Sequence, residues 1–177
     1  MLQGAALQIG DGKAAAIIQQ SLRVNGSAAD LVSTILDYSR IDDLRSAPLK
    51  VLFDVSGIFD DLMLIYQPIA AEKSVDIAFG ASTVSLFSDR NLLMQALSNF
   101  LDNAIRSSRA GDTVLVTCER QAETVRILVT DAVEQGTTRP GAAGYGYGII
   151  NRIAQVLGAE IIHQDNSRGL LFDLANT

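Results

Sequence analysis

The stretch SDRNLLMQALSNFLDNAIRSS, residues 88–108, decides the fold of this 177-residue chain. Asp89 is predicted to be an N-cap, because its carboxylate can accept hydrogen bonds from the first free N–H groups of a helix. Apolar residues then recur every three or four positions, which predicts a helix to about Ser107 with one buried face. The residues predicted to face inward are Leu92, Leu93, Ala96, Leu97, Phe100, Leu101, Ala104 and Ile105.

The same stretch carries two asparagines, Asn99 and Asn103, four positions apart. That spacing presents both amides on one face of a helix. Carboxamides combine donors with an acceptor and carry no charge, so they suit a group made of Mg²⁺ and a triphosphate. Arg106 adds a cation near the same face. Taken alone, the pair is better explained as two polar residues on a hydrated helix face.

Two later segments also contain residues suited to a nucleotide. Asp131 ends the apolar run VRILVTD, where its carboxylate can accept a hydrogen bond from an exocyclic amine such as that of adenine. An aspartate at the end of a strand is more often a simple turn former. Gly144, Gly146 and Gly148 precede or begin an apolar helix predicted at 147–157, where backbone N–H groups can approach a phosphate closely. A flexible turn would explain the glycines as well.

The remaining pattern predicts a second helix and several short strands. The helix is expected at 55–71, and strands are expected at 49–53, 75–79, 84–87, 113–118, 125–129, 160–164 and 170–174. Because some strands follow one another as hairpins, an all-parallel sheet is disfavoured. The expected fold is therefore α+β, a two-layer α/β sandwich with a mixed sheet and three helices on one face.

Residues 13–44 carry a different pattern, a long helix with two adjacent apolar seams. Such a wide apolar face is typical of a helix in a four-helix bundle, so we expect a homodimer formed through 13–44. Residues 2–9 read as a stub of an earlier helix, joined by a turn at Gly10-Asp11-Gly12. We therefore predict two domains, a helical dimerisation segment at 1–46 and a second domain at 47–177.

The composition argues against several classes of protein. The chain has 14 Lys and Arg against 20 Asp and Glu, a net charge of −6, and its long-range field would repel nucleic acid. No apolar run reaches the roughly 18 residues that would indicate a membrane span, and the N-terminus lacks the pattern of a signal peptide. The single cysteine, Cys118, can form neither an internal disulfide nor a zinc site. We expect a cytoplasmic location without membrane contact by this segment.

In combination, the N-x-x-x-N-A helix, the strand-terminal Asp131 and the Gly-x-Gly-x-Gly helix start resemble the N, G1 and G2 boxes of the GHKL ATPase superfamily, and specifically of sensor histidine kinases. ADLVSTILDYSRIDDL, residues 29–44, is similar to the end of the second dimerisation helix of these kinases. The resemblance covers residues 13–177. It implies a Bergerat-type ATPase fold, preceded by a helical-hairpin remnant of a four-helix-bundle dimerisation domain.

The resemblance also implies a reaction. The family transfers the γ-phosphoryl group of ATP to a histidine, for relay to an aspartate on the receiver domain of a response regulator. By this resemblance ATP and Mg²⁺ are the cofactors, Asn103 ligates Mg²⁺ and Asn99 supports the cluster of metal and phosphate. Arg106 takes the place of the usual lysine near the phosphates.

The same resemblance assigns the base and phosphate contacts. Asp131 would bind the adenine amino group. Gly144, Gly146 and Gly148 would line the triphosphate beneath a lid formed by residues 132–143.

The chain departs from the family in three places. No H-E/D-x-R-x-P-type phosphoacceptor motif is found, and by the family's spacing it would fall before Met1, so the chain resembles a truncation with no catalytic residue of its own. The only histidine, His163, lies in a predicted strand and is expected to be structural. The G1 box D-x-G-x-G reads Asp131-Ala132-Val133-Glu134-Gln135, which puts a β-branched side chain where the nucleotide would approach. The lid is also short, without a recognisable F box.

Two alternatives stay open. The lost G1 glycines and the missing histidine favour a kinase-like docking or phosphotransfer-regulating module that binds receiver domains or other kinases without using ATP. A serine kinase of the anti-sigma type shares the nucleotide fold, but the helical segment at 13–44 argues against that class.

Overall fold

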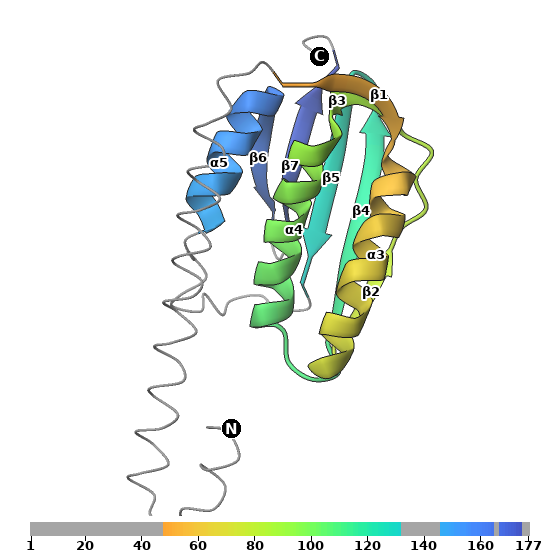
Figure 1. Ribbon diagram of the computed structural model, residues 1–177, viewed down its shortest axis with the longest axis vertical. Helices are drawn as coiled ribbons and strands as arrows, with labels where there is room; N and C mark the ends of the chain where they lie inside the picture. Colours follow the sequence, from red (N-terminus) through yellow and green to blue (C-terminus); the bar gives the residue numbers. More distant parts are fainter. Residues whose placement is uncertain (1–47, 132–145, 165–166, 175–177) are drawn as a thin grey trace, which may run out of the picture. The chain divides into compact units, whose positions relative to one another are not determined.

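A computed structural model describes residues 48–131, 146–164 and 167–174 (Figure 1). The chain divides into two units, residues 1–40 and 41–177, and every described residue belongs to the second. The helices expected at 2–9 and 13–44 lie outside the described residues. The domain boundary expected at 46/47 therefore stays a prediction.

The described elements follow the order that the sequence predicts. They are β1 (Lys50–Asp54), α3 (Val55–Glu72), β2 (Asp76–Phe79), β3 (Ser85–Asp89), α4 (Arg90–Ser107), β4 (Thr113–Gln121), β5 (Thr124–Thr130), α5 (Gly146–Leu157), β6 (Ala159–Gln164) and β7 (Ser167–Asp173). The largest differences from expectation are at strand ends, since β4 continues to Gln121 and β7 already begins at Ser167.

Five strands form a mixed sheet in the order β2-β4-β5-β7-β6. Strand β2 runs parallel to β4, and the three other pairs are antiparallel. The expected mixed sheet is therefore confirmed. Two of the expected strands stay out of it, because β1 pairs with β3 in a separate antiparallel ribbon.

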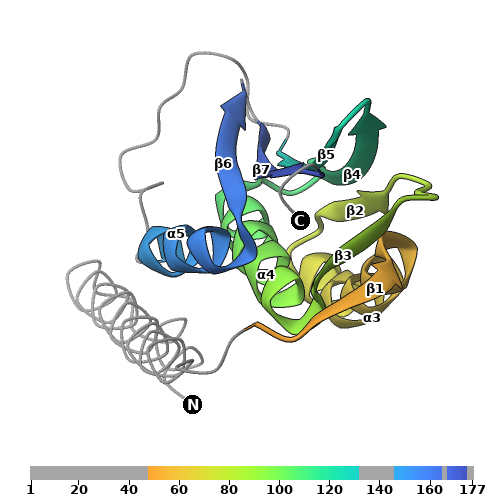
Figure 2. The ribbon, with the colours of Figure 1, turned by 90° about the horizontal axis from the view of Figure 1, so that it is seen from above.

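Helices α3, α4 and α5 all cover one face of the five-stranded sheet (Figures 1 and 2). The core lies between these two layers, and Leu93, Leu97 and Leu101 of α4 are completely buried in it. All eight residues predicted to face inward from α4 are buried. Burying a large apolar side chain contributes about 1.5–3 kcal/mol, so this single helix face anchors the helical layer to the sheet.

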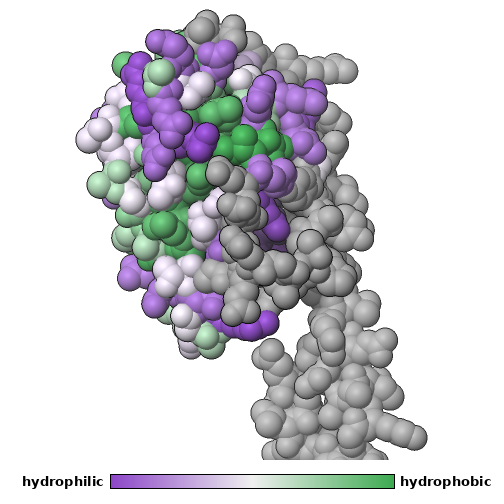
Figure 3. Space-filling model, turned by 180° about the vertical axis from the view of Figure 1, so that it is seen from behind, coloured by the Kyte–Doolittle hydropathy of each residue, from purple (hydrophilic) through white to green (hydrophobic). Residues whose placement is uncertain are grey.

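The other face of the sheet is seen from behind in Figure 3, where hydrophobic residues gather between hydrophilic ones. Alternation along β4 explains the two faces. Val114 and Val116 point into the core and are fully buried, whereas Leu115 between them is 40% exposed. The fold is thus a two-layer α/β sandwich with helices on one face, as predicted.

Gly169 in β7 allows an unusually close approach of two strands. It is paired with Leu128 of β5. A Cβ atom at position 169 would lie 1.9 Å from the carbonyl oxygen of Ile127, which is backbone and cannot rotate away. Glycine is therefore required at this point of the sheet.

No helix within the described parts of the chain is both long and apolar enough to span a membrane.

Candidate functional site

The site is built around α4, whose first turn is fixed by Asp89. This residue is an N-cap as predicted, and its Oδ1 accepts hydrogen bonds from the backbone N–H groups of Asn91 at 3.0 Å and Leu92 at 3.1 Å. Its second oxygen, Oδ2, accepts from the backbone N–H of Leu49 at 2.8 Å. A single buried carboxylate thus holds both the start of the helix and the chain that enters β1.

Helix α3 runs parallel to α4 and contacts it at both ends. At the N-terminal end, the Arg90 guanidinium at the start of α4 forms an ion pair with Asp61 of α3. At the C-terminal end, Lys73 Nζ donates to the carbonyl oxygens of Ile105 at 2.7 Å and Arg106 at 2.6 Å. A cation at this position satisfies helix-terminal carbonyls and interacts favourably with the helix dipole.

Tyr66 joins the two helices midway. Its hydroxyl donates to the carbonyl oxygen of Ser98 on α4 at 3.1 Å. Burial raises the pKa of Tyr66 well above its usual value, and the neighbouring Asp102 carboxylate raises it further. The phenol therefore stays protonated and keeps its hydrogen bond to the Ser98 carbonyl oxygen on α4.

Asn99 and Asn103 lie on one face of α4 and are both half-buried. The Asn99 side-chain nitrogen donates to the carbonyl oxygen of Gln95 at 2.9 Å, so part of its donor capacity is used within the helix. Arg106, in the last turn, is exposed. The helix therefore brings the three predicted phosphate and metal contacts together along its C-terminal half.

Asp131 directly follows β5 and is half-buried. Its Oδ2 lies 3.2 Å from the Oγ atom of Ser107, the last residue of α4. Before it, the Thr130 and Ser167 hydroxyls lie 2.7 Å apart and join the end of β5 to β7. The structure thus joins Asp131 to the asparagine-bearing helix through Ser107, which the sequence did not single out.

The described part of the glycine segment begins α5, the helix beside α4 (Figures 1 and 2). Gly146 is the first residue of α5, and the half-buried Gly148 lies in its first turn. In Figure 1 the first turn of α5 and the end of β5 lie at about the height of the middle of α4. Gly144 and the predicted lid at 132–143, which includes Val133, lie outside the described residues.

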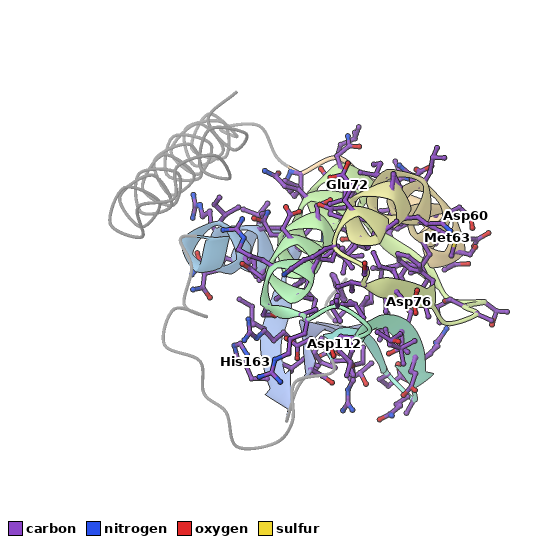
Figure 4. The ribbon with its side chains drawn as sticks, turned by 90° about the horizontal axis from the view of Figure 1, so that it is seen from below. Asp60, Met63, Glu72, Asp76, Asp112 and His163 are labelled. Carbon is purple, nitrogen blue, oxygen red and sulfur yellow. The ribbon has the colours of Figure 1, made fainter. Side chains whose placement is uncertain are left out.

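His163 is on β6, in the strand that the sequence predicts for it. Its side chain is exposed, and its cross-strand partner is Arg168 of β7. Figure 4 places it on the opposite side of the domain from Asp60 and Met63 of α3.

Comparison with known proteins identifies the family. Residues 88–174, from the end of β3 to just past β7, match the family described as histidine kinase-, DNA gyrase B- and HSP90-like ATPases. The span includes α4, Asp131 and the start of α5, so it contains every nucleotide-binding residue that the sequence predicts.

Curated relatives are sensor kinases. Sensor histidine kinase CusS of Escherichia coli strain K12 is 26% identical over 101 residues, which cover 57% of this chain and 21% of CusS. Sensor protein VanSB of Enterococcus faecalis is 23% identical over 196 residues, which cover 97% of this chain and 43% of VanSB. The chain thus spans about a fifth of the first relative and less than half of the second.

Solved structures share the fold. Full-length ShkA in complex with AMPPNP has a TM-score of 0.65 at 21% identity, over 92% of this chain and 38% of ShkA. Histidine kinase ThkA in complex with response regulator protein TrrA has a TM-score of 0.62 at 18% identity, over 97% of this chain and 55% of that one. Taken with the fold and the arrangement around α4, these matches show that residues 88–174 belong to the histidine kinase-, DNA gyrase B- and HSP90-like ATPase family and that the chain is similar to sensor histidine kinases.

Proposed function

We propose that residues 47–177 are the ATP-binding catalytic domain of a two-component sensor histidine kinase. The observation that carries this proposal is the hydrogen bond between Ser107 and Asp131, because it sets a carboxylate beside the helix that bears Asn99 and Asn103. A carboxylate can accept the exocyclic amine of adenine, and the helix offers neutral amides to the phosphates. The family match and the sensor-kinase relatives support the same function.

The side chains on α4 fit Mg²⁺ and a triphosphate. Asn103 would ligate the metal through its amide oxygen, a hard ligand of the kind that Mg²⁺ prefers, while Asn99 supports the cluster. The exposed Arg106 adds a positive charge, which matters in a chain of net charge −6. The metal, when bound, would neutralise charge on the β- and γ-phosphates.

The start of α5 would bind the phosphates through its backbone. Gly146 and Gly148 in its first turn, with Gly144 before it, would present N–H groups unshielded by side chains. A helix N-terminus also favours an anion through its dipole. Contacts of this kind add no net positive charge to the domain, so they agree with its acidic composition.

The reaction would transfer the γ-phosphoryl group of ATP to a histidine. That histidine is expected to lie outside residues 1–177, because His163 is exposed on β6 and is not surrounded by a phosphoacceptor motif. Relay to the aspartate of a response-regulator receiver domain would follow, and the complex of ThkA with TrrA supports such a partner. ATP and receiver domains occur in the cytoplasm, where we expect this domain to act.

Calorimetric titration of Mg²⁺ with a non-hydrolysable ATP analogue tests the proposal. We expect saturable heat with the wild-type chain and none with Asn103→Ala. Asn91→Ala is the matched control, since Asn91 is an exposed asparagine in the first turn of the same helix. Absence of heat at millimolar analogue, with the fold intact by circular dichroism, would refute ATP binding.

A docking module that does not use ATP is the second candidate. It is favoured by the sequence Ala132-Val133-Glu134-Gln135, which replaces the glycines of the G1 box. This function predicts that a receiver domain binds equally well with and without nucleotide, mainly through residues 13–44. Strict dependence of receiver binding on ATP would contradict it.

We also propose that the chain forms a homodimer through residues 13–44. The proposal depends on the two apolar seams in that segment. Light scattering should then give twice the mass of one chain. A strictly monomeric species whose 13–44 segment is helical would contradict it.

A further inference from the structure

We propose that Ser107 is a positioning residue that orients the Asp131 carboxylate and so gives the site its preference for purines with a 6-amino group. The inference rests on the proposed function. Ser107 ends α4 and lies 3.2 Å from Asp131 Oδ2, and both residues are half-buried.

The Ser107 hydroxyl carries a single hydrogen, so it can donate fully to only one acceptor at a time. Among the described residues, its Oγ lies near Asp131 Oδ2 at 3.2 Å and near the carbonyl oxygen of Ala104 at 2.9 Å. The Ala104 carbonyl already accepts from the Ser108 backbone N–H at 3.0 Å and from the Ser108 hydroxyl at 2.8 Å. A carbonyl oxygen has two lone pairs, so these two donors satisfy it.

The carboxylate is therefore the better acceptor for the Ser107 hydrogen. A hydrogen bond to an ionised group is also roughly twice as strong as one between neutral groups. Ser108 is only 4% exposed, which keeps its two hydrogen bonds to Ala104 out of competition with water. The hydroxyl of Ser107 is thus directed to Asp131.

The backbone before Asp131 is held by both neighbouring strands. Thr130 pairs with Leu115 of β4 on one side and with Ser167 of β7 on the other. The side chains of Thr130 and Ser167 are also in hydrogen-bond contact. The backbone before Asp131 is therefore fixed from both sides, and the Ser107 hydroxyl fixes the carboxylate itself.

The two carboxylate oxygens of Asp131 therefore accept hydrogen bonds from different donors. Oδ2 accepts from Ser107, so Oδ1 is the oxygen presented to a nucleobase. A 6-amino purine donates to it, whereas a purine with only hydrogen at position 6 has nothing to donate. Without Ser107 the carboxylate can rotate, and ordering it would then be part of the cost of binding.

The test compares ATP with purine riboside triphosphate, which lacks only the 6-amino group, by calorimetric titration with Mg²⁺. We expect Ser107→Ala to weaken ATP binding by roughly five- to tenfold, the effect of one modest hydrogen bond, and to leave binding of purine riboside triphosphate unchanged. Ser107→Thr retains the hydroxyl and should restore most of the affinity for ATP. Ser98→Ala, a half-buried serine of the same helix, is the matched control.

The outcomes separate this inference from the proposed function. If Ser107→Ala lowers the affinity for both nucleotides equally, Ser107 merely supports the end of α4. If it lowers neither affinity, Ser107 has no role in binding. Either result overturns the inference and leaves ATP binding standing. If the wild-type chain binds neither nucleotide, the proposed function fails and the inference fails with it.

Discussion

Asp89 and Leu49 are joined by a hydrogen bond of 2.8 Å between residues forty positions apart, and the same carboxylate caps α4. The side chain is only 8% exposed, so water cannot readily replace it. Loss of this group would leave the backbone N–H groups of the first turn and of Leu49 without their acceptor.

We therefore expect Asp89→Ala to lower the free energy of unfolding by about 1–3 kcal/mol, the combined effect of a lost N-cap and a lost buried acceptor. Asp89→Asn retains one acceptor oxygen and should recover most of the cap. Urea unfolding followed by circular dichroism measures both. Asp60→Ala removes an exposed carboxylate from α3 and is the control; if it costs as much as Asp89→Ala, the two contacts of Asp89 do not stabilise the domain.

Replacing two of the glycines by alanine is expected to change the free energy of unfolding in opposite directions. Gly169→Ala places a Cβ atom against the backbone of Ile127, so we expect a loss of at least about 2 kcal/mol in the free energy of unfolding. Gly57 lies inside α3, where an added Cβ atom would have no neighbour within 4 Å. Gly57→Ala should therefore gain about 0.5–1 kcal/mol, because alanine favours the helix. If urea unfolding shows the same change in stability for the two variants, β5 and β7 can separate at little cost in free energy.

Tyr66 should make stability depend on alkaline pH. Below pH 10.0, its ordinary pKa, the phenol is protonated in both states and contributes no pH dependence. Above it the unfolded chain loses the proton first, since burial and Asp102 raise the pKa in the folded state. Stability therefore falls with rising pH, by at most about 1.4 kcal/mol per pH unit, until the folded-state pKa is reached.

Tyr66→Phe isolates this effect. Near neutral pH the variant should be less stable by about 0.5–1.5 kcal/mol, because the hydrogen bond to the Ser98 carbonyl is lost. Above pH 10.0 the deficit should shrink, since only the wild type carries the titrating phenol. Urea unfolding of both proteins across this range is the measurement, and a deficit that does not change with pH would show that Tyr66 ionises normally in the folded state.

Cys118 should be slow to react in the folded protein. Burial raises the pKa of its thiol, the nearby Glu119 carboxylate adds to the shift, and a hydrogen bond with Ser82 partly offsets it. The thiol is 7% exposed and is the only one in the chain, so a colorimetric disulfide reagent reports on it alone. At mildly alkaline pH we expect the folded protein to release the coloured thiolate of the reagent many times more slowly than the protein unfolded in concentrated urea. Equal rates would mean that the end of β4 opens freely.

The strongest local pattern predicted α4 in detail. The sequence predicted its N-cap, its last residue and all eight buried side chains. This was possible because the spacing of apolar residues in an amphipathic helix indicates which face is buried. The helix predicted at 55–71 is also present, and α3 continues through Pro68 to Glu72. Pro68 is exposed, so the hydrogen bond that proline cannot donate is replaced by water at low cost.

Contacts between distant residues could not be predicted in this way. The separation of β1 and β3 from the main sheet depends on pairings such as Leu52 with Phe87, which no periodicity encodes. Ser107 was missed for the same reason, since a serine at a helix end has several ordinary explanations and its partner Asp131 is 24 residues away. A short polar residue next to the N-x-x-x-N-A motif was the only signal for it in the sequence.

The β1–β3 ribbon has a mechanical consequence. A pull along the axis of β1 loads the hydrogen bonds between the two antiparallel strands together, in shear. Strand β3 ends at Asp89, where α4 begins. A load on β1 therefore reaches two helices, α3 through the covalent junction of Asp54 and Val55 and α4 through β3, before it reaches the five-stranded sheet.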